Sequence, residues 1–126
     1  MKFVRYQSTR PNSRGVHPGI FGLANVLGRD GNFSATQQVV WRTGNDWYNE
    51  AYPDPSDRYP DVYDHQINPG AVAWFKSSAR HLLERVEPYL VLLDAHQVPW
   101  EKLESDHPGR IVYEDEFQVI ATPVVP

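Results

Sequence analysis

The stretch RIVYEDEFQVIA, residues 110–121, has the composition of a β-strand and organises the interpretation of the whole chain. Side chains alternate between the two faces of a strand. One face would therefore carry a mostly apolar set, which we predict packs on the core: Ile111, Tyr113, Asp115, Phe117, Val119 and Ala121. The opposite face would carry Val112, Glu114, Glu116, Gln118 and Ile120.

The pair Glu114 and Glu116 on one face of this strand has two interpretations. Glutamate is a poor strand former, so two of them in a row with Gln118 need a reason. An antiparallel sheet often has one face in water, and charged side chains on an edge strand discourage aggregation. Alternatively, paired carboxylates on a rigid strand provide acid/base chemistry or stabilise a developing positive charge.

The strongest helical signal lies upstream, over residues 79–93. Its apolar residues recur at helical spacing: Ala79, Leu82, Leu83, Val86, Leu90 and Leu93. Pro88 lies inside this pattern and predicts a kink, or a break at which Pro88 opens a second helix. Ser77 or Ser78 is the expected N-cap, because a serine hydroxyl accepts hydrogen bonds from the first backbone N–H groups of a helix.

The other expected elements are shorter. Strands are predicted at 2–7 and 71–75, a short helix at 20–27, and a short strand within 97–103. Ser34 and Gln37 have the spacing of a capping box and predict a second helix from Ser34 onward. Together these elements predict a single α+β domain over residues 1–126, with a small mixed or antiparallel sheet and two to four helices.

Residues 52–70 interrupt this pattern with a segment rich in proline, aspartate and tyrosine that has no amphipathic period. A loop of this length is uncommon in a compact domain unless it has a function or is disordered. Its tyrosines favour an ordered loop packed on the surface.

The composition excludes several classes of function. The chain contains no cysteine, so disulfides, thiolate metal sites and a cysteine nucleophile are excluded. A net charge of −4 argues against nucleic acid as the main partner. No histidine or aspartate spacing matches a metal motif, so no metal is expected. Arg5 interrupts the N-terminal apolar residues, and no apolar run could span a membrane, so we expect a cytoplasmic protein without membrane association.

Three stretches carry a resemblance to a known family. VRY (4–6) places an arginine on the first strand, WFKSS (74–78) places serines after a later strand, and YEDEFQV (113–119) contains a Glu-x-Glu. This order resembles the arginine, serine and glutamate pattern of ADP-ribosyltransferases. The stretches GNDWY (44–48) and YEDEFQV also resemble those of small bacterial proteins. The family resemblance implies NAD as substrate, an unspecified acceptor and no metal.

The resemblance also implies catalytic roles for the two glutamates. Cleavage of the nicotinamide–ribose bond passes through an oxocarbenium-like state. Glu116 would stabilise that charge and bind the 2′-hydroxyl of the ribose, and Glu114 would orient or deprotonate the acceptor.

Four further residues would bind NAD under the same resemblance. Arg5 would hold a phosphate, because a guanidinium matches phosphate geometry. Ser77 would orient the catalytic glutamate and the ribose. Trp74 or Trp47 would stack on the nicotinamide.

A second interpretation involves no catalysis. The acidic, tyrosine-rich loop 52–68 would bind a protein or a small ligand, because aromatic residues suit both kinds of surface. The aromatic residues that could rim a cleft or form such a surface are Trp47, Tyr48, Tyr52, Tyr59 and Tyr63. Alternatively, Trp47 and Tyr48 pack in the core, because they fit a stripe of the second helix that comprises Val40, Gly44, Trp47, Tyr48 and Ala51.

Overall fold

The computed structural model describes residues 2–124 and confirms a single α+β domain. Its sheet has the strand order β3-β1-β2-β5-β4, and every neighbouring pair is antiparallel. The strands are β1 (Phe3–Ser8), β2 (Val72–Lys76), β3 (Trp100–Ser105), β4 (Arg110–Glu114) and β5 (Gln118–Thr122). The helices are α1 (Ile20–Arg29), α2 (Ala35–Ala51), α3 (Pro55–Arg58), α4 (Arg80–Leu83) and α5 (Glu87–Ala95).

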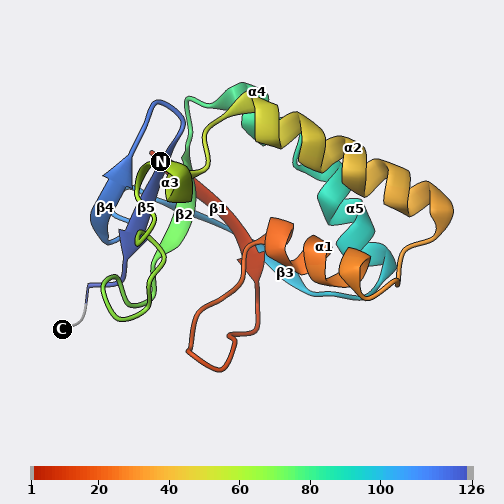
Figure 1. Cartoon of the computed structure of the whole chain (residues 1–126), viewed down its shortest axis with the longest axis horizontal. Coiled ribbons are helices and arrows are strands. Elements are labelled where there is room, and N and C mark those ends of the chain that lie inside the picture. Colours follow the sequence, from red (N-terminus) through yellow and green to blue (C-terminus); the bar gives the residue numbers. More distant parts are fainter. Residues whose placement is uncertain (1, 125–126) are drawn as a thin grey trace.

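Helices α1, α2, α4 and α5 gather on one side of the sheet (Figure 1). The core between these layers contains Ile20, Ala24, Tyr48, Phe75, Ala79, Leu82, Val86, Tyr89 and Leu93. Phe21 of α1 lies at its aromatic centre, with its ring centroid 4.8 Å from that of Tyr48 and 4.9 Å from that of Tyr89. Both contacts are edge-to-face, the arrangement that ring quadrupoles favour.

The predicted long loop is ordered and covers the rest of the same sheet face. It begins with α3 and continues over residues 59–71, where Val62 is buried against Tyr113 and Ile120. In the β2–β5 register Ala73 pairs with Ile120 and Phe75 with Gln118, so alternation places Ile120 on the same face as Phe75. The helices and the loop therefore cover neighbouring areas of one face.

Strands β1 and β2 separate after a short pairing. They are paired at Val4 and Phe75, whereas β1 follows β3 along its whole length. Past that point the free edge of β1 pairs with the segment before α1, through a bridge from Gln7 to Gly19. The Ser8 N–H also donates to the Pro18 carbonyl at 2.7 Å. The sheet is thus open between β1 and β2.

The prediction of one strand over 110–121 is wrong, because this stretch folds as a hairpin of β4 and β5. The Asp115 carboxylate turns the chain by accepting hydrogen bonds from the backbone N–H groups of Phe117 at 2.8 Å and Gln118 at 3.1 Å. An aspartate side chain that accepts hydrogen bonds from backbone N–H groups just ahead of it in the chain stabilises a turn in this way. The expected common row of Glu114, Glu116 and Gln118 is therefore absent, since Gln118 is buried and both glutamates are exposed.

The helical stripe at 79–93 is interrupted, in agreement with the break predicted at Pro88. The helix α4 ends before Val86, and Pro88 lies in the first turn of α5. The expected serine cap is wrong: Ala79 occupies the N-cap of α4 without a side-chain hydrogen bond. Ser77 and Ser78 are exposed in the turn after β2, which the Ala79 N–H closes by donating to the Lys76 carbonyl at 2.9 Å.

Helix α2 begins as predicted and packs most of the predicted stripe on the core, namely Gly44, Trp47, Tyr48 and Ala51, with Val40 as the exception. The Ser34 hydroxyl accepts from the Gln37 N–H, and the Gln37 side chain accepts from the Ser34 N–H, so the capping box is confirmed. Tyr48 is buried, but Val40 is 38% exposed. Trp41 turns inward instead, because it packs against Gly28 of α1, where no side chain competes for the space.

Candidate functional site

A cleft of about 860 Å³ lies where the helical cover and the loop cover meet above the opening between β1 and β2. Its walls come from the segment before α1, from α1 and α2, from the loop 52–71 and from the central strands. The side chains that carry its polar and aromatic character are Arg5, His17, Asn25, Asn45, Tyr48, Tyr52, Asp54, Asp57, Tyr63 and Gln118.

Arg5 fills the opening in the sheet. Its Nη1 donates to the Ala73 carbonyl at 2.8 Å, across the gap between β1 and β2. Its Nη2 donates to the His17 carbonyl at 2.6 Å, and its Nε donates to Gln7 Oε1 at 2.9 Å. Three of the five guanidinium N–H groups are therefore engaged, and two remain for another acceptor.

The Arg5 cation is buried without an anion. The residue is 7% exposed, yet no carboxylate within residues 2–124 forms an ion pair with it. Burial lowers the pKa of Arg5 to about 10, so the side chain stays charged at neutral pH. Buried charges in proteins are normally paired with an opposite charge, and this one lines a cleft.

Tyrosines form the loop side of the cleft. Desolvation raises the pKa of Tyr63 to about 12, and the nearby charge of Asp54 adds to that rise while Arg5 opposes it. The pKa of Tyr52 also rises, first through desolvation and then through Tyr63 and Asp54. Both hydroxyls therefore remain protonated at neutral pH and are available as hydrogen-bond donors.

The helix side of the cleft is fixed by a polar network among three helices. Asn25 of α1 accepts from Trp41 Nε1 at 2.9 Å and from Asn45 Nδ2 at 3.0 Å. Asn45 in turn accepts from the Tyr89 hydroxyl of α5 at 2.6 Å. The hydroxyl of Tyr48 donates to the Leu82 carbonyl at 2.6 Å. These bonds hold the amide groups of the helix wall in one arrangement.

Gln118 and Asp115 fix the loop wall to the hairpin. Gln118 Nε2 donates to the Pro53 carbonyl at 2.9 Å and to Asp115 Oδ2 at 3.0 Å, and the Tyr113 hydroxyl donates to the same oxygen at 2.7 Å. Burial by itself would raise the pKa of Asp115, but hydrogen bonds from Tyr113, Phe117 and Gln118 lower it below its usual value. The start of the loop is thus tied to β5.

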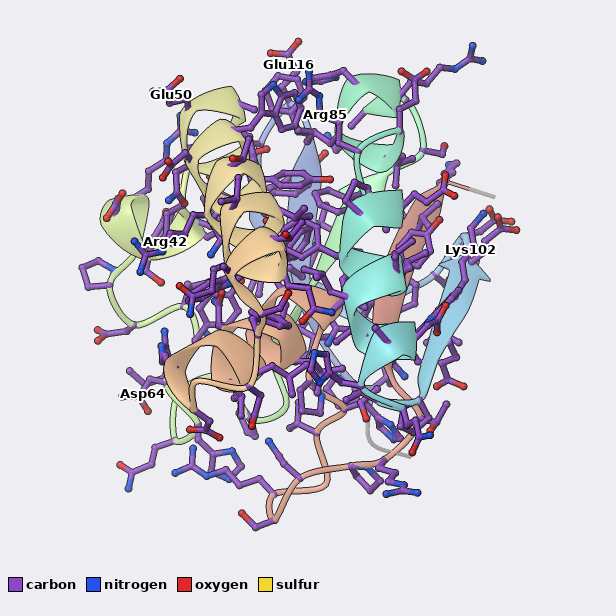
Figure 2. The ribbon with its side chains drawn as sticks, turned by 90° about the vertical axis from the view of Figure 1, so that its right-hand side faces the viewer. Arg42, Glu50, Asp64, Arg85, Lys102 and Glu116 are labelled. Atoms are coloured by element: carbon purple, nitrogen blue, oxygen red, sulfur yellow. The ribbon has the colours of Figure 1, made fainter. Side chains whose placement is uncertain are left out.

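The predicted site residues fall into separate places, and Arg5 is the member of that set that lines the cleft. Glu114 forms an ion pair with Lys76 at 2.6 Å. Glu116 is exposed in the hairpin turn, and Figure 2 shows it at the top edge of the molecule, far from Asp64 of the loop at lower left.

Ser77 lies near the hairpin and away from the cleft lining. The preceding residue, Lys76, donates its N–H to the Phe117 carbonyl at 2.8 Å, which brings the end of β2 to the hairpin turn. The Ser77 N–H donates to the Lys2 carbonyl at 2.8 Å. The structure therefore places the end of β2 beside the hairpin that carries both glutamates, and it places Arg5 in the cleft.

The two tryptophans predicted to stack on a ligand do not line the cleft. Trp74 is buried on the opposite sheet face, where it packs with Val119 and Ala121. Trp47 packs against Tyr48, and the Arg85 guanidinium lies 4.1 Å from the centre of its ring. Trp47 therefore has a structural role in covering the core.

Gln118 was not predicted to line a cleft, whereas part of the loop that was considered as a binding surface does line it. Gln118 looked like part of a solvent-facing row because the turn at Asp115 was not recognised. The feature of the sequence that could have indicated this turn is Asp115, which lies between two apolar runs and three residues before Gln118.

Comparison with protein-family models, with curated proteins and with solved structures finds no match to this chain. Over residues 2–124, no helix is long and apolar enough to cross a membrane. The same residues contain no group of three or more acidic or histidine side chains arranged to hold a metal ion.

Proposed function

We propose that this chain binds a small organic anion in the cleft, with the anionic group of the ligand on the Arg5 guanidinium. The observation that carries the proposal is the charge of Arg5, which is buried in the cleft without a counter-ion. Its guanidinium has two further N–H groups, and guanidinium groups are suited to carboxylates and phosphates.

The rest of the cleft is suited to the body of such a ligand. Its volume of about 860 Å³ lies in the range of small-molecule sites. The rings of Phe21, Tyr52 and Tyr63 offer apolar area, while Asn25 and Asn45 offer amide groups. Binding sites commonly combine aromatic walls with a few fixed polar groups.

ADP-ribosyl transfer from NAD stays a prediction within this framework. A dinucleotide would place a phosphate on Arg5, as the family resemblance implies. The glutamates assigned to catalysis would have to act from the end of β4 and from the hairpin turn, outside the cleft lining. A cytoplasmic location also stays a prediction, compatible with a chain that lacks cysteine.

Titration calorimetry and thermal melting test the proposed binding with five probes: acetate, butyrate, inorganic phosphate, ADP-ribose and NAD. At least one probe is expected to bind and to raise Tm, because a ligand that binds the folded state stabilises it. Arg5→Lys keeps the charge but loses the two-pronged geometry, so it should weaken binding about tenfold. The matched control is Arg42→Lys, since Arg42, which is labelled in Figure 2, is exposed on α2 and is not among the residues that line the cleft.

The comparison of ligand binding by wild type and by Arg5→Lys decides the outcome. Equal binding by wild type and Arg5→Lys would contradict the proposal, as would the failure of all five probes to bind. If Arg5→Lys unfolds, Tyr63→Ala is the second variant. Tyr63 is 44% exposed, so its removal should preserve the fold and still weaken binding.

A further inference from the structure

The charged groups of the cleft are separated by depth. Arg5 lies at the base and is 7% exposed, whereas Asp54 and Asp57 line the same cleft as exposed side chains at its rim. A ligand that reaches Arg5 therefore meets a positive charge at one end of its path and negative charges at the other.

The two rim carboxylates are not neutralised by the protein. Within residues 2–124, neither Asp54 nor Asp57 forms an ion pair. Asp54 Oδ1 accepts a hydrogen bond from the Ser56 N–H at 2.9 Å as the N-cap of α3, which leaves its second oxygen for another donor. The cleft thus presents charges of both signs that do not pair with each other.

We propose that the ligand is an amino carboxylate, a zwitterion that places its carboxylate on Arg5 and its primary ammonium group between Asp54 and Asp57. This inference rests on the proposed function, because it specifies the anion that Arg5 binds. A simple anion would be attracted by the Arg5 guanidinium and repelled by the two rim carboxylates. In a zwitterion, the carboxylate would be attracted by Arg5 and the ammonium group by the two rim carboxylates.

The aromatic wall supports the same orientation. Tyr52 and Tyr63 line the cleft, and Asp54 lies near enough to both for its charge to raise the pKa of each hydroxyl. An ammonium group beside Asp54 would therefore also lie near tyrosine rings, whose faces attract cations. Phosphate is an anion without a cationic group, so neither the Asp54 carboxylate nor the tyrosine rings would attract it at the rim.

The length of the ligand can be measured with a series of probes. We would titrate the chain with β-alanine, 4-aminobutyrate and 6-aminohexanoate, which separate the two charges by increasing numbers of methylene groups. The matched probes without the amine are propionate, butyrate and hexanoate. One amino carboxylate is expected to bind at least about tenfold more tightly than its amine-free counterpart.

Three variants locate the ammonium group. Asp54→Asn keeps the acceptor that caps α3 and removes the charge, so it should preserve the fold. Asp54→Asn and Asp57→Asn should each reduce the affinity for the best amino carboxylate about fivefold. They should leave the affinity for the matched simple carboxylate unchanged or higher. Asp61→Asn is the control, because Asp61 is exposed in the same loop but does not line the cleft.

Two results would overturn the inference, and they differ in what they imply for the proposed function. If simple carboxylates or phosphate bind as tightly as the amino carboxylates, and Arg5→Lys weakens them all, the cleft binds anions without selecting zwitterions. If no member of either series binds to the wild type and the anion probes also fail, both proposals fall.

Discussion

At the scale of single residues, Asp115 connects the hairpin turn with the side chains beside it. Its two carboxylate oxygens accept four hydrogen bonds, which come from two backbone N–H groups, the Tyr113 hydroxyl and the Gln118 amide. Through Gln118 the same carboxylate connects the hairpin turn to Pro53 at the start of the loop. One aspartate thus fixes both the turn and a wall of the cleft.

We expect Asp115→Ala to destabilise the protein by about 1.5–3 kcal/mol, the usual contribution of hydrogen bonds to a charged group. Chemical denaturation monitored by tryptophan fluorescence would measure the loss. Asp115→Asn keeps an oxygen for the backbone turn and should lose less. Equal losses of unfolding free energy in both variants would show that the charge of Asp115, and not the hydrogen bonds of its oxygens in the turn, stabilises the protein.

The stabilising effect of Asp115 should also depend on pH. Its pKa in the folded protein lies below the usual value of 3.8, so the folded state favours the carboxylate form. The difference in stability between wild type and Asp115→Asn should therefore be constant near neutral pH. It should shrink as the pH falls below about 4, where the carboxylate becomes protonated. A difference that grows in acid would contradict this account.

Glu116 offers a contrast at the same scale. It is exposed in the hairpin turn, and neither a hydrogen bond nor an ion pair involves its side chain within residues 2–124. Glu116→Gln should change the unfolding free energy by less than about 0.5 kcal/mol.

That stability makes Glu116→Gln a clean test of ADP-ribosyl transfer. The transfer hypothesis predicts that wild-type protein releases fluorescence from etheno-NAD and that Glu116→Gln at equal stability does not. Absence of turnover in both proteins would leave the glutamates without a catalytic role. Glu114→Gln is less informative, because it also removes the ion pair with Lys76.

At the scale of elements, the helical layer depends on close approach at Gly44. A Cβ at this position would lie 2.7 Å from the Tyr89 hydroxyl oxygen, which donates to Asn45. Tyr89 is 2% exposed and therefore has no room to move aside. Gly44, which looks like a weak point in the middle of α2, is where α2 and α5 meet.

Gly44→Ala should therefore destabilise the protein by about 1–3 kcal/mol, despite the better helix propensity of alanine, because overpacking a core costs this much. Gly22→Ala is the control. Gly22 lies in α1, and a Cβ there meets no atom within 4 Å. This change should stabilise by up to about 1 kcal/mol, since only the propensity effect remains. Thermal melting compares the two, and a stabilising Gly44→Ala would contradict the packing argument.

At the scale of the whole molecule, the two covers of the sheet differ in how they are held. The helical layer packs through a large apolar core, whereas residues 59–71 are anchored by Val62 and by turns such as the one from the Val62 N–H to the Tyr59 carbonyl at 3.0 Å. Strand β5, an interior strand of the sheet, is buried along its whole length and is paired on both sides.

Amide hydrogen exchange should reflect this difference. Amides at 119–121 should exchange at least about a hundredfold more slowly than those at 63–67, because exchange from β5 requires opening of the sheet. Mass spectrometry of the exchanged protein, digested into peptides, measures both regions at once. Similar protection in the two regions would mean that the loop and the sheet unfold as a unit.

The sequence by itself determined the local elements. Strand β1, helix α1, the capping box of α2 and the break at Pro88 follow from propensity, hydrophobic period and capping, which depend on residues close together in the chain. The ordered tyrosine-rich loop was also predicted from local composition, whereas Arg5 became a candidate through the family resemblance. Each of these features is decided within a few residues.

The tertiary structure alone decided the hairpin at Asp115, the inward turn of Trp41 and the cleft itself. The acidic stretch at 113–119 alternates like a strand, and only the bonds from Asp115 to Phe117 and Gln118 show that it reverses. The lack of an ion pair between Arg5 and any carboxylate in residues 2–124 depends on how β1, β2 and the segment at His17 come together. Burial and charge pairing are properties of the assembled chain, because they depend on neighbours that are distant in sequence.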